Sequence, residues 1–494
     1  MRRWLAAAVA AAALTACGST VQLGAGGAPQ QSDELALTQP GAGAAPRTGV
    51  GGTTTGDLSV PSSGGQAVLK PGSSPGAVAG SGTRGSAVAA PNAASGSALP
   101  SNAPVRVGVM YLKDASAAGA ALGINGLETG DTEAQAKAVA NWMNAHGGAA
   151  GHKIVLYFAG ITAQQTEQNP QLAQQAACAQ LTQDNKVQFV VTYLNLLPGT
   201  MDCFAKASTS VIDDLSNLAD WEQQKYSNIF AAPGDFAPGR MLRELVDALW
   251  RTGWLTKTSK VGAYGYDNPD NRRLVDQSLA QALAAHGLKI AKEEYVTNDA
   301  NGVAQTSNVS LQFRAAGVDR IIPVLASPLF IMEAAASQGY HPAYAMYSAF
   351  GPGALMETAA PKDQLANSRG IGWSPYLDIG RGTHPGPVNA NETLCFNIYK
   401  KAGQGSSSAT TKGLQLNLCS VLLYLKFAAD RAKAVTSELL GQARPLVRAS
   451  FPPPDTFRSD MSRHSDGAAG YRDIAYEQNC GCYQYVSAVH LTSG

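Results

Sequence analysis

From Val105 onward, short apolar segments alternate with amphipathic ones, and this alternation constrains the fold more than any other feature of the chain. Strands are expected at residues 105–111, 152–158, 187–192, 210–214, 260–266, 289–295 and 319–324. Helices are expected between them, at 131–146, 169–177, 200–207, 238–253, 272–286 and 303–316. Apolar strands separated by helices form parallel sheets that are covered on both faces. The pattern therefore predicts an α/β protein with two doubly wound parallel sheets.

The first 17 residues have the pattern of an export signal. Two arginines precede an apolar run, which is too short to cross a bilayer of about 30 Å as a mature helix. The ending Leu14-Thr15-Ala16-Cys17 resembles a bacterial lipobox, in which the cysteine is acylated and becomes the new N-terminus. An ordinary signal peptide with an incidental cysteine and a twin-arginine signal are the alternatives. The expected location is the outer face of the cell membrane, with Cys17 as the lipid anchor.

Residues 18–104 are rich in Gly, Ala, Ser, Thr and Pro and contain no aromatic residue. Such a segment cannot bury enough apolar surface to offset its backbone entropy, so a disordered tether is expected. The stretch Ser81–Gly85 superficially resembles a phosphate-binding loop. No strand precedes it and no Lys-Ser/Thr follows it, which excludes that interpretation.

The charge balance excludes nucleic acid as a partner. The chain has 37 basic and 36 acidic side chains, whereas a nucleic-acid-binding protein needs an excess of basic groups to displace counterions. Charged residues make up only 15% of the 494 residues. This low share reflects the tether and the apolar strands, and it says nothing about a small ligand.

Two segments resemble type I periplasmic binding proteins of the branched-chain amino-acid group. Residues 138–154 read AVANWMNAHGGAAGHKI, similar to the helix ending in Asn-x-x-Gly-Gly-x-x-Gly-x-x-Ile that leads into the family's second strand. Residues 228–239, NIFAAPGDFAPG, resemble the crossover into the family's second lobe. The resemblance extends from Val105 to about Trp373, and beyond that only the order of elements matches.

This resemblance implies two α/β lobes joined by three crossing segments, with a ligand held between them and closure by hinge bending. Lobe one is expected to contain residues 105–233 and 374–450, and lobe two residues 234–373 and 451–494. Ligands of open α/β sheets bind beyond the carboxyl ends of the strands. The candidate ligand-binding residues at those ends are Tyr111, Tyr193, Asn195, Ser216 and Asn217 in lobe one, and Tyr266, Asp267, Ser327, Ser348 and Phe350 in lobe two.

Each candidate also has a structural interpretation, because Tyr and Phe pack under loops and Asn, Asp and Ser cap helices or make turns. The chain departs from the amino-acid receptors in two places. Residues 192–198 (TYLNLLP) stand where the family has a Ser/Thr-rich loop for the ligand carboxylate, and residues 267–271 (DNPDN) replace its Tyr-Gly. Tyr193, Tyr266 and Phe350 would suit an apolar or aromatic ligand, and Asp267 or Asp270 could pair with a cation.

Six cysteines remain when Cys17 is acylated, and an even number in an exported chain favours disulfides. Cys178 and Cys203 fall on consecutive expected helices, as do Cys395 and Cys419. Cys480 and Cys482 are separated by one residue, so a bridge between them would be strained, and pairing with Cys395 or Cys419 stays open. A zinc site is a weaker alternative, since no Cys-x-x-Cys or paired histidine accompanies these residues.

No enzyme motif occurs in a strand-to-helix context, and neither a cofactor nor a metal is expected. Asp213-Asp214 follows a strand and could form a paired-carboxylate site, although such residues more often serve as a turn or cap. Residues 414–435 are expected to form a core helix and not a membrane span.

The expected function is that of an extracytoplasmic, lipid-anchored solute-binding protein with a small-molecule ligand, an amino acid or another metabolite, and an ABC permease as partner. The principal alternative is a bilobed ligand sensor or surface interaction lipoprotein with no transporter. A cleft hydrolase is the third.

Overall fold

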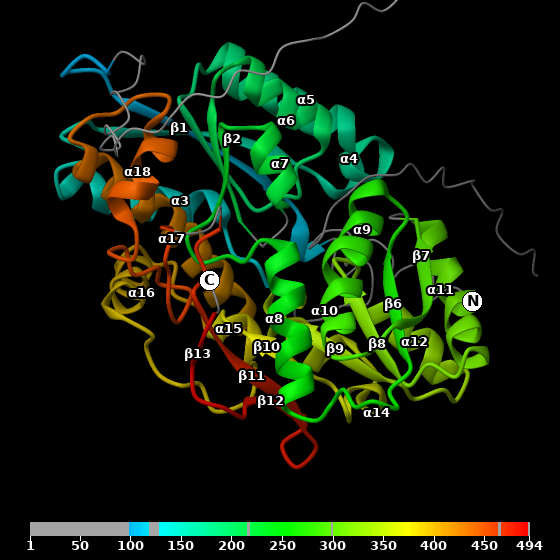
Figure 1. Ribbon diagram of the computed structural model, residues 1–494. Coiled ribbons are helices and arrows are strands. Elements are labelled where there is room, and N and C mark those ends of the chain that lie inside the picture. Colours follow the sequence, from blue (N-terminus) through cyan, green and yellow to red (C-terminus); the bar gives the residue numbers. More distant parts are fainter. Residues whose placement is uncertain (1–97, 118–127, 215–217, 298–299, 463–465, 493–494) are drawn as a thin grey trace, which may run out of the picture. The chain divides into compact units, whose positions relative to one another are not determined.

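The computed structural model describes residues 98–117, 128–214, 218–297, 300–462 and 466–492. The expected signal peptide, Cys17 and the tether up to residue 97 lie outside the described residues, as do the candidates Ser216 and Asn217. The described residues confirm two α/β lobes, each built on its own sheet (Figure 1).

Lobe one is built on a parallel sheet with the strand order β2-β1-β3-β4-β5. Its strands are β1 (Val105–Leu112), β2 (Ile154–Ile161), β3 (Phe189–Thr192), β4 (Ser210–Asp213) and β5 (Ile229–Ala231). Parallel neighbours require a crossover connection, and the intervening helices supply it. They are α3 (Thr132–Ala145), α4 (Ala163–Gln168), α5 (Pro170–Ala179) with the π-helical turn η1 (Gln180–Asp184), α6 (Pro198–Lys206) and α7 (Asp220–Lys225).

Local sequence explains where these helices begin. The side chain of Asp131 accepts a hydrogen bond from the Ala134 N–H at the start of α3. Asn169 caps α5 in the same way, and Pro170 takes the first helical position, where its missing N–H costs nothing. At the other end of α3, Gly148 adopts a positive φ of 65°. A Cβ atom there would lie 2.0 Å from the His152 carbonyl oxygen, so the tight turn into β2 requires glycine.

Three helices from the C-terminal half complete lobe one, and Figure 1 shows them in gold to orange beside the blue and cyan elements. They are α16 (Ala390–Lys401), α17 (Ala409–Ala432) and α18 (Leu439–Val447). Helix α17 packs against α3 and β3, and most of its side chains are buried in the core of this lobe. The expected helix at 414–435 is therefore a core helix that starts five residues earlier. None of the helices that the structure describes is both long and apolar enough to cross a membrane.

Lobe two is built on a larger sheet with the order β12-β11-β10-β9-β8-β6-β7, and β13 pairs with β11. Its strands are β6 (Val261–Tyr266), β7 (Ile290–Val296), β8 (Arg320–Val324), β9 (Ala343–Tyr347), β10 (Arg369–Gly372), β11 (Gly470–Glu477), β12 (Cys482–Tyr485) and β13 (His490–Leu491). Its helical segments are α8 (Pro238–Arg251), α9 (Pro269–Leu274), η2 (Val275–Leu279), α10 (Ala280–Ala285), α11 (Ala300–Ala315), α12 (Leu329–Ser337), η3 (Ser348–Phe350), η4 (Pro352–Met356), α13 (Glu357–Ala359), α14 (Lys362–Leu365) and α15 (Pro375–Asp378).

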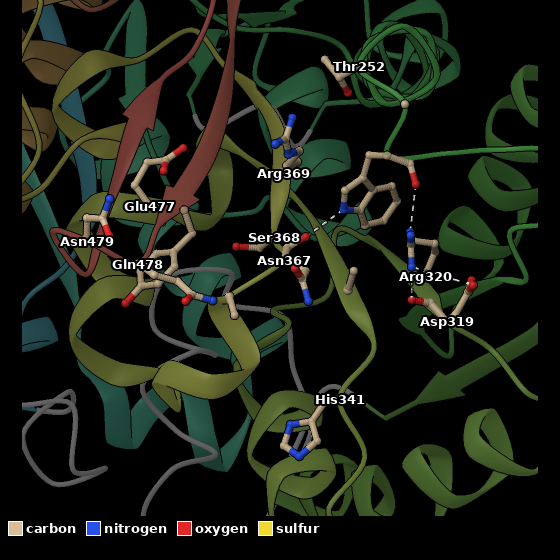
Figure 2. A pocket seen from close by; sticks show the side chains of 15 residues that line it. Thr252, Asp319, Arg320, His341, Asn367, Ser368, Arg369, Glu477, Gln478 and Asn479 are labelled. Carbon is tan, nitrogen blue, oxygen red and sulfur yellow. Dashed lines mark hydrogen bonds and ion pairs between the residues drawn. The ribbon is translucent and has the colours of Figure 1, made fainter.

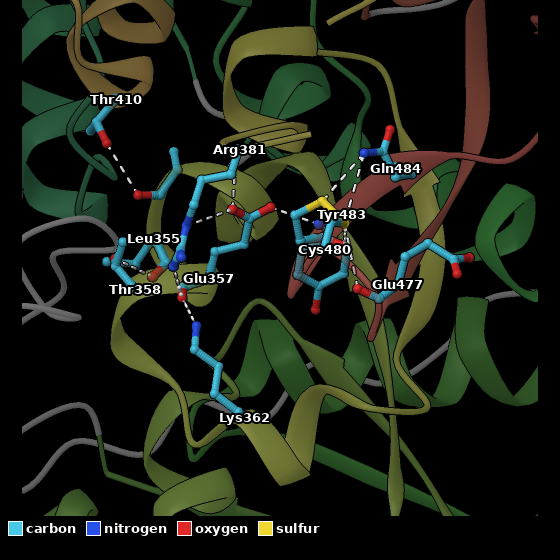
Figure 3. Close-up of polar contacts among 12 residues, drawn as sticks. Leu355, Glu357, Thr358, Lys362, Arg381, Thr410, Glu477, Cys480, Tyr483 and Gln484 are labelled. Atoms are coloured by element: carbon cyan, nitrogen blue, oxygen red, sulfur yellow. Dashed lines mark hydrogen bonds and ion pairs between the residues drawn. A yellow bond between two sulfur atoms is a disulfide. The ribbon is translucent and has the colours of Figure 1, made fainter. Parts of the chain in front are cut away.

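The tail adds an antiparallel part to this sheet, whose strands β6 to β10 form the expected parallel sheet. Strand β11 runs antiparallel to β10 and to β12. Gly481, with a positive φ of 60°, makes the turn of the β11–β12 hairpin. The hairpin is fixed by the buried Glu357, whose Oε1 accepts the Tyr483 N–H at 2.6 Å and whose Oε2 accepts the Arg381 N–H at 3.1 Å (Figure 3).

The lobe boundaries expected at 374 and 451 both lie too early in the chain. Ile379 belongs to the apolar core of lobe two, whereas Phe451 and Met461 belong to that of lobe one. The chain crosses between the lobes at residues 232–237 (the first crossing), 373–379 (the second crossing) and 452–467 (the third crossing, without its undescribed residues 463–465). These crossing segments have no periodic pattern of apolar residues, so the sequence does not mark where the core of one lobe ends and that of the other begins.

Three disulfides join the cysteines of the described residues. Cys178 pairs with Cys203, between α5 and α6, and Cys395 pairs with Cys419, between α16 and α17. Cys480 pairs with Cys482 at the turn of the β11–β12 hairpin, and not with either cysteine of lobe one. Cys395 and Cys419 are fully buried.

We expect the double substitution Cys395→Ala/Cys419→Ala to lower the free energy of unfolding by about 3 kcal/mol, because this bridge closes a loop of 24 residues. The substitution Cys480→Ala/Cys482→Ala should cost roughly 1–2 kcal/mol, since its loop spans two residues. Urea denaturation of the three proteins measures both differences. Equal losses would contradict loop closure as the main contribution.

Candidate functional site

The carboxyl ends of the strands bring the candidate residues of each lobe to one edge. In lobe one, Met110 pairs in register with Thr192, which pairs with Asp213 on β4. Tyr111, Tyr193 and Asp214 therefore come at or just after neighbouring strand ends. In lobe two, Tyr266, Ser327 and Ser348 end or follow β6, β8 and β9, which are neighbours in the second sheet.

The two edges meet through the helices that follow β4 and β6. The indole Nε1 of Trp221 on α7 donates a hydrogen bond to Asp270 Oδ1 on α9 at 3.0 Å. The guanidinium of Arg273 lies 4.3 Å from the Trp221 ring centroid. Both contacts join an element of lobe one to an element of lobe two. Asp270, which the sequence suggested as a partner for a ligand cation, accepts this indole N–H.

Two tyrosines of lobe one are held by the start of α3. The Tyr111 hydroxyl donates to Glu133 Oε1 at 2.7 Å, and the Tyr193 hydroxyl shares a 2.9 Å hydrogen bond with that of Thr132. The Tyr111 bond, together with the Lys137 ammonium, lowers the pKa of Glu133. Burial raises the pKa values of Tyr111 and Tyr193, so both phenols stay protonated. Tyr111 is buried, whereas Tyr193 and Asn195 are partly exposed.

Several lobe-two candidates serve the fold. The Ser348 hydroxyl accepts the N–H groups of Trp373 at 2.8 Å and Ser374 at 3.3 Å, which fixes the second crossing. Phe350 is buried with its ring centroid 4.0 Å from that of Tyr347, and Ser327 is buried beside the start of α12. Among the described lobe-two candidates, Tyr266 and Asp267 retain exposed surface. Asp267 forms an ion pair with Arg272 at 2.8 Å.

Buried carboxyl groups gather near the crossings, and the sequence indicated only the Asp213-Asp214 pair. Burial raises the pKa of Asp213 well above its usual range, and the nearby charges of Asp214 and Glu222 add to this effect. Burial also raises the pKa of Asp455 to about 8, helped by Asp214, and that of Glu222 to about 7. Among the described residues, Asp213 Oδ1 and Asp455 Oδ1 are buried without a hydrogen-bond partner.

Asp378, on α15, is a further buried carboxyl group that the sequence did not indicate. Burial raises its pKa to about 7 although Oδ2 accepts hydrogen bonds from the Tyr485 hydroxyl at 2.6 Å and the Ser374 N–H at 2.9 Å. Asp378 and Asp455 follow no strand, so a search of strand ends could not find them. The three prolines at 452–454 mark a rigid segment before Asp455. They are the one feature of the sequence that draws attention to this residue.

All three crossings contribute to a small cavity beside these groups. Its volume is about 10 Å³, close to what a single water molecule requires. The crossings are therefore packed against one another with room for no more than a water. The cavity is lined by Asp235, Ser348, Ala349, Trp373, Ser374, Leu377, Asn417 and Asp455.

A larger cavity, of about 690 Å³, lies at the opposite edge of lobe two (Figure 2). Arg320, Ala343 and Arg369 line it, and they stand at or near the amino ends of β8, β9 and β10. The Arg320 Nε donates to the Trp254 carbonyl at 2.9 Å. Ligands of open α/β sheets bind at the carboxyl ends, so this cavity is not the candidate ligand site. No group of His, Cys, Asp and Glu suited to a metal ion occurs within the described ranges.

Comparison with known proteins matches residues 104–438 to the family described as periplasmic binding protein. A leucine-bound ABC transporter substrate-binding protein from Desulfitobacterium hafniense is 11% identical, with a TM-score of 0.52, covering 78% of this chain and 100% of its own. The isoleucine-bound protein LivJ from Streptococcus pneumoniae is 14% identical, with a TM-score of 0.52 and coverages of 79% and 99%.

A solute-binding protein of an ABC transporter from Rhodopseudomonas palustris, solved with 4-hydroxybenzoate, is 12% identical. Its TM-score is 0.57, and the match covers 79% of this chain and 98% of its own. At these identities the likeness concerns the fold. Comparison with curated proteins finds no significant match.

The buried carboxyl groups make the unfolding free energy depend on pH. A carboxyl group whose pKa is higher in the folded state than its unfolded value of about 3.9 binds a proton more tightly when folded. Its stabilising contribution is complete below that value and is lost as pH rises through the folded pKa, which is about 8 for Asp455 and about 7 for Asp378.

We therefore expect the melting temperature of the protein to fall between pH 5 and pH 8, and to fall less in Asp455→Asn. One group contributes up to about 1.4 kcal/mol per pH unit to this slope. Thermal melts across that range measure it. Asp319→Asn, at the exposed opposite edge of lobe two, should keep the wild-type slope. An unchanged slope in Asp455→Asn would contradict the assignment.

Proposed function

The chain belongs to the periplasmic binding protein family, and we propose that it is a lipid-anchored extracytoplasmic protein that captures a small molecule between its lobes for an ABC importer. The observation that carries this proposal is the Trp221–Asp270 hydrogen bond, because it brings together the helices that follow the carboxyl ends of β4 and β6. A ligand placed between those edges would contact both lobes at once. This is the geometry that hinge closure around a ligand requires.

We infer that the ligand contacts are made by the candidates that keep exposed surface: Tyr193 and Asn195 in lobe one, and Tyr266 and Asp267 in lobe two. These side chains offer two phenol rings, an amide and a carboxylate, but no basic group. The solved relatives hold leucine, isoleucine and 4-hydroxybenzoate, each of which carries a carboxylate. The proposed ligand of this chain is a small molecule with an apolar or aromatic body, held by rings and hydrogen bonds.

The lipid anchor rests on the sequence Leu14-Thr15-Ala16-Cys17. A thiol at the cleavage point gives the lipid its attachment atom, and the glycine-rich segment that follows would let the lobes reach solutes away from the bilayer. The importer rests on the relatives, which are described as components of ABC transporters. A bilobed sensor without a transporter is the alternative, and permease genes beside this one would decide between them.

A thermal-shift screen of the full chain against small metabolites tests ligand capture. A ligand at one hundred times its Kd stabilises the protein by about 2.7 kcal/mol, which raises the melting temperature by several kelvin. We expect Asp267→Asn to reduce this rise and Asp319→Asn to preserve it. Both aspartates are half exposed and lie near an arginine, but they stand at opposite edges of the lobe-two sheet. Equal shifts in both variants would contradict the placement, and no shift with any compound would contradict ligand capture.

The anchor has its own test. The substitution Cys17→Ser removes the thiol to which the lipid would be attached, so we expect loss of labelled palmitate and release from the membrane fraction. Ser19→Ala, two residues beyond the lipobox, should retain both properties. Labelled and membrane-bound Cys17→Ser protein would show that Cys17 is not the anchor.

A further inference from the structure

A cavity of about 560 Å³ lies beside the first crossing, apart from the candidate ligand site. Its walls come from α7 and β5 of lobe one, from α8 of lobe two, from α18 and from the third crossing. It is therefore lined by both lobes and by two of the three segments that join them. The lining residues are Asp220, Gln223, Gln224, Ser227, Ile229, Phe230, Ala237, Arg240, Arg243, Arg444 and Asp466.

One guanidinium of this cavity is rigidly held. Arg240, on α8, is 4% exposed, and its Nη2 lies 2.8 Å from Asp466 Oδ1 while its Nε lies 3.1 Å from Oδ2. The Ala468 carbonyl accepts a further hydrogen bond from Nη2. The Phe236 ring lies beneath the guanidinium, with 4.3 Å between its centroid and the Arg240 Cζ. Arg240 Nη1 is buried without a hydrogen-bond partner among the described residues.

The described residues that line the cavity carry more positive than negative groups. Three guanidinium groups, of Arg240, Arg243 and Arg444, face two carboxylates, of Asp220 and Asp466. Asp466 is already engaged by Arg240 and by the Ala237 N–H. Arg444 donates to the Asp466 carbonyl at 3.0 Å, and burial lowers the pKa of its guanidinium despite the nearby Asp466 charge. An incompletely balanced positive charge in a partly desolvated site favours an anion.

The neutral lining fits the same class of ligand. Gln223 and Gln224, on α7, present amide groups, and Ser227 adds a hydroxyl. Amide and hydroxyl donors complement guanidinium groups around an oxygen-rich anion, as in other phosphate sites. We propose that this cavity binds a small oxyanion of the phosphate class. Its Arg243 side chain comes from lobe two, whereas Arg444 and the α7 amides come from lobe one, so the anion would bridge the lobes.

Bridging has a consequence for the hinge. An anion that contacts both lobes binds most tightly in the arrangement that places Arg243 and Arg444 around one cavity. The anion would therefore shift the lobes toward that arrangement. The size of the shift depends on how much more tightly the anion binds this arrangement than any other. None of the proposed ligand contacts lines this cavity, so anion binding can be measured without the captured solute.

The test uses the full chain and inorganic phosphate as the probe. Melting temperatures are measured against phosphate concentration at pH 7, with sodium chloride keeping the ionic strength constant. We expect a saturable rise of several kelvin, and an apparent Kd weakened at least tenfold in Arg243→Gln and in Arg444→Gln. Arg243 is exposed, so its substitution leaves the fold intact and is the decisive variant. Arg431→Gln, an exposed arginine on α17, should retain the wild-type curve.

Phosphate also stabilises proteins in general, because it is excluded from their surfaces. That effect rises without saturation and is shared by all variants. The proposed site would be overturned if the melting temperature rose without saturation, or did not rise at all. It would also be overturned if Arg243→Gln gave the same curve as the wild type. Sulfate and citrate titrations distinguish a tetrahedral anion from a carboxylate, and a response to citrate alone would overturn the phosphate class. Asp267→Asn should bind phosphate as the wild type does.

Discussion

The buried ion pair between Arg240 and Asp466 is the interaction on which the relation of the two lobes depends. Its side chains are 5% and 1% exposed, so neither charge is solvated by water. Removing two charges from water costs several kcal/mol, and only close, multiple hydrogen bonds offset that cost. Arg240 supplies them from the first turn of α8, and the Ala237 N–H supplies another. The pair therefore fixes the start of lobe two to the third crossing.

The backbone segments next to Arg240 and Asp466 are also closely packed against each other. The Gly467 and Ala468 N–H groups both donate to the Asp235 carbonyl, which joins the first and third crossings directly. A Cβ atom at Gly467 would lie 2.1 Å from the Pro233 carbonyl oxygen, so no larger residue fits. Close packing of three chain segments leaves little space for water. It also explains why the carboxyl groups nearby, Asp213 and Asp455 among them, are desolvated.

The sequence predicted strands and helices well where the spacing of apolar residues determines the secondary structure. Parallel strands and their helices from Val105 to Val324 lie close to their expected positions, because an apolar run between two helices has few alternatives. The tail was not predictable in this way. Strand β11 pairs with β10, about a hundred residues earlier, and β12 is joined to Glu357 by the Tyr483 N–H, a contact between residues far apart in the chain. At the candidate site, strand ends predict Tyr193 and Tyr266 as ligand contacts, which stays a prediction. Asp378 and Asp455 could not be predicted in this way, because they lie on crossings and neighbouring turns that no sequence period marks.

The same packing links proton binding to the arrangement of the lobes. Asp455 has a raised pKa because the crossings exclude water from it and place Asp214 near it. A movement that opened the crossings would hydrate this carboxyl group and return its pKa toward about 3.9, the value of a solvated aspartate. The packed arrangement consequently binds the proton more tightly than an opened one, and acid favours it. A carboxyl group whose charge changes with burial would thus make the hinge sensitive to pH.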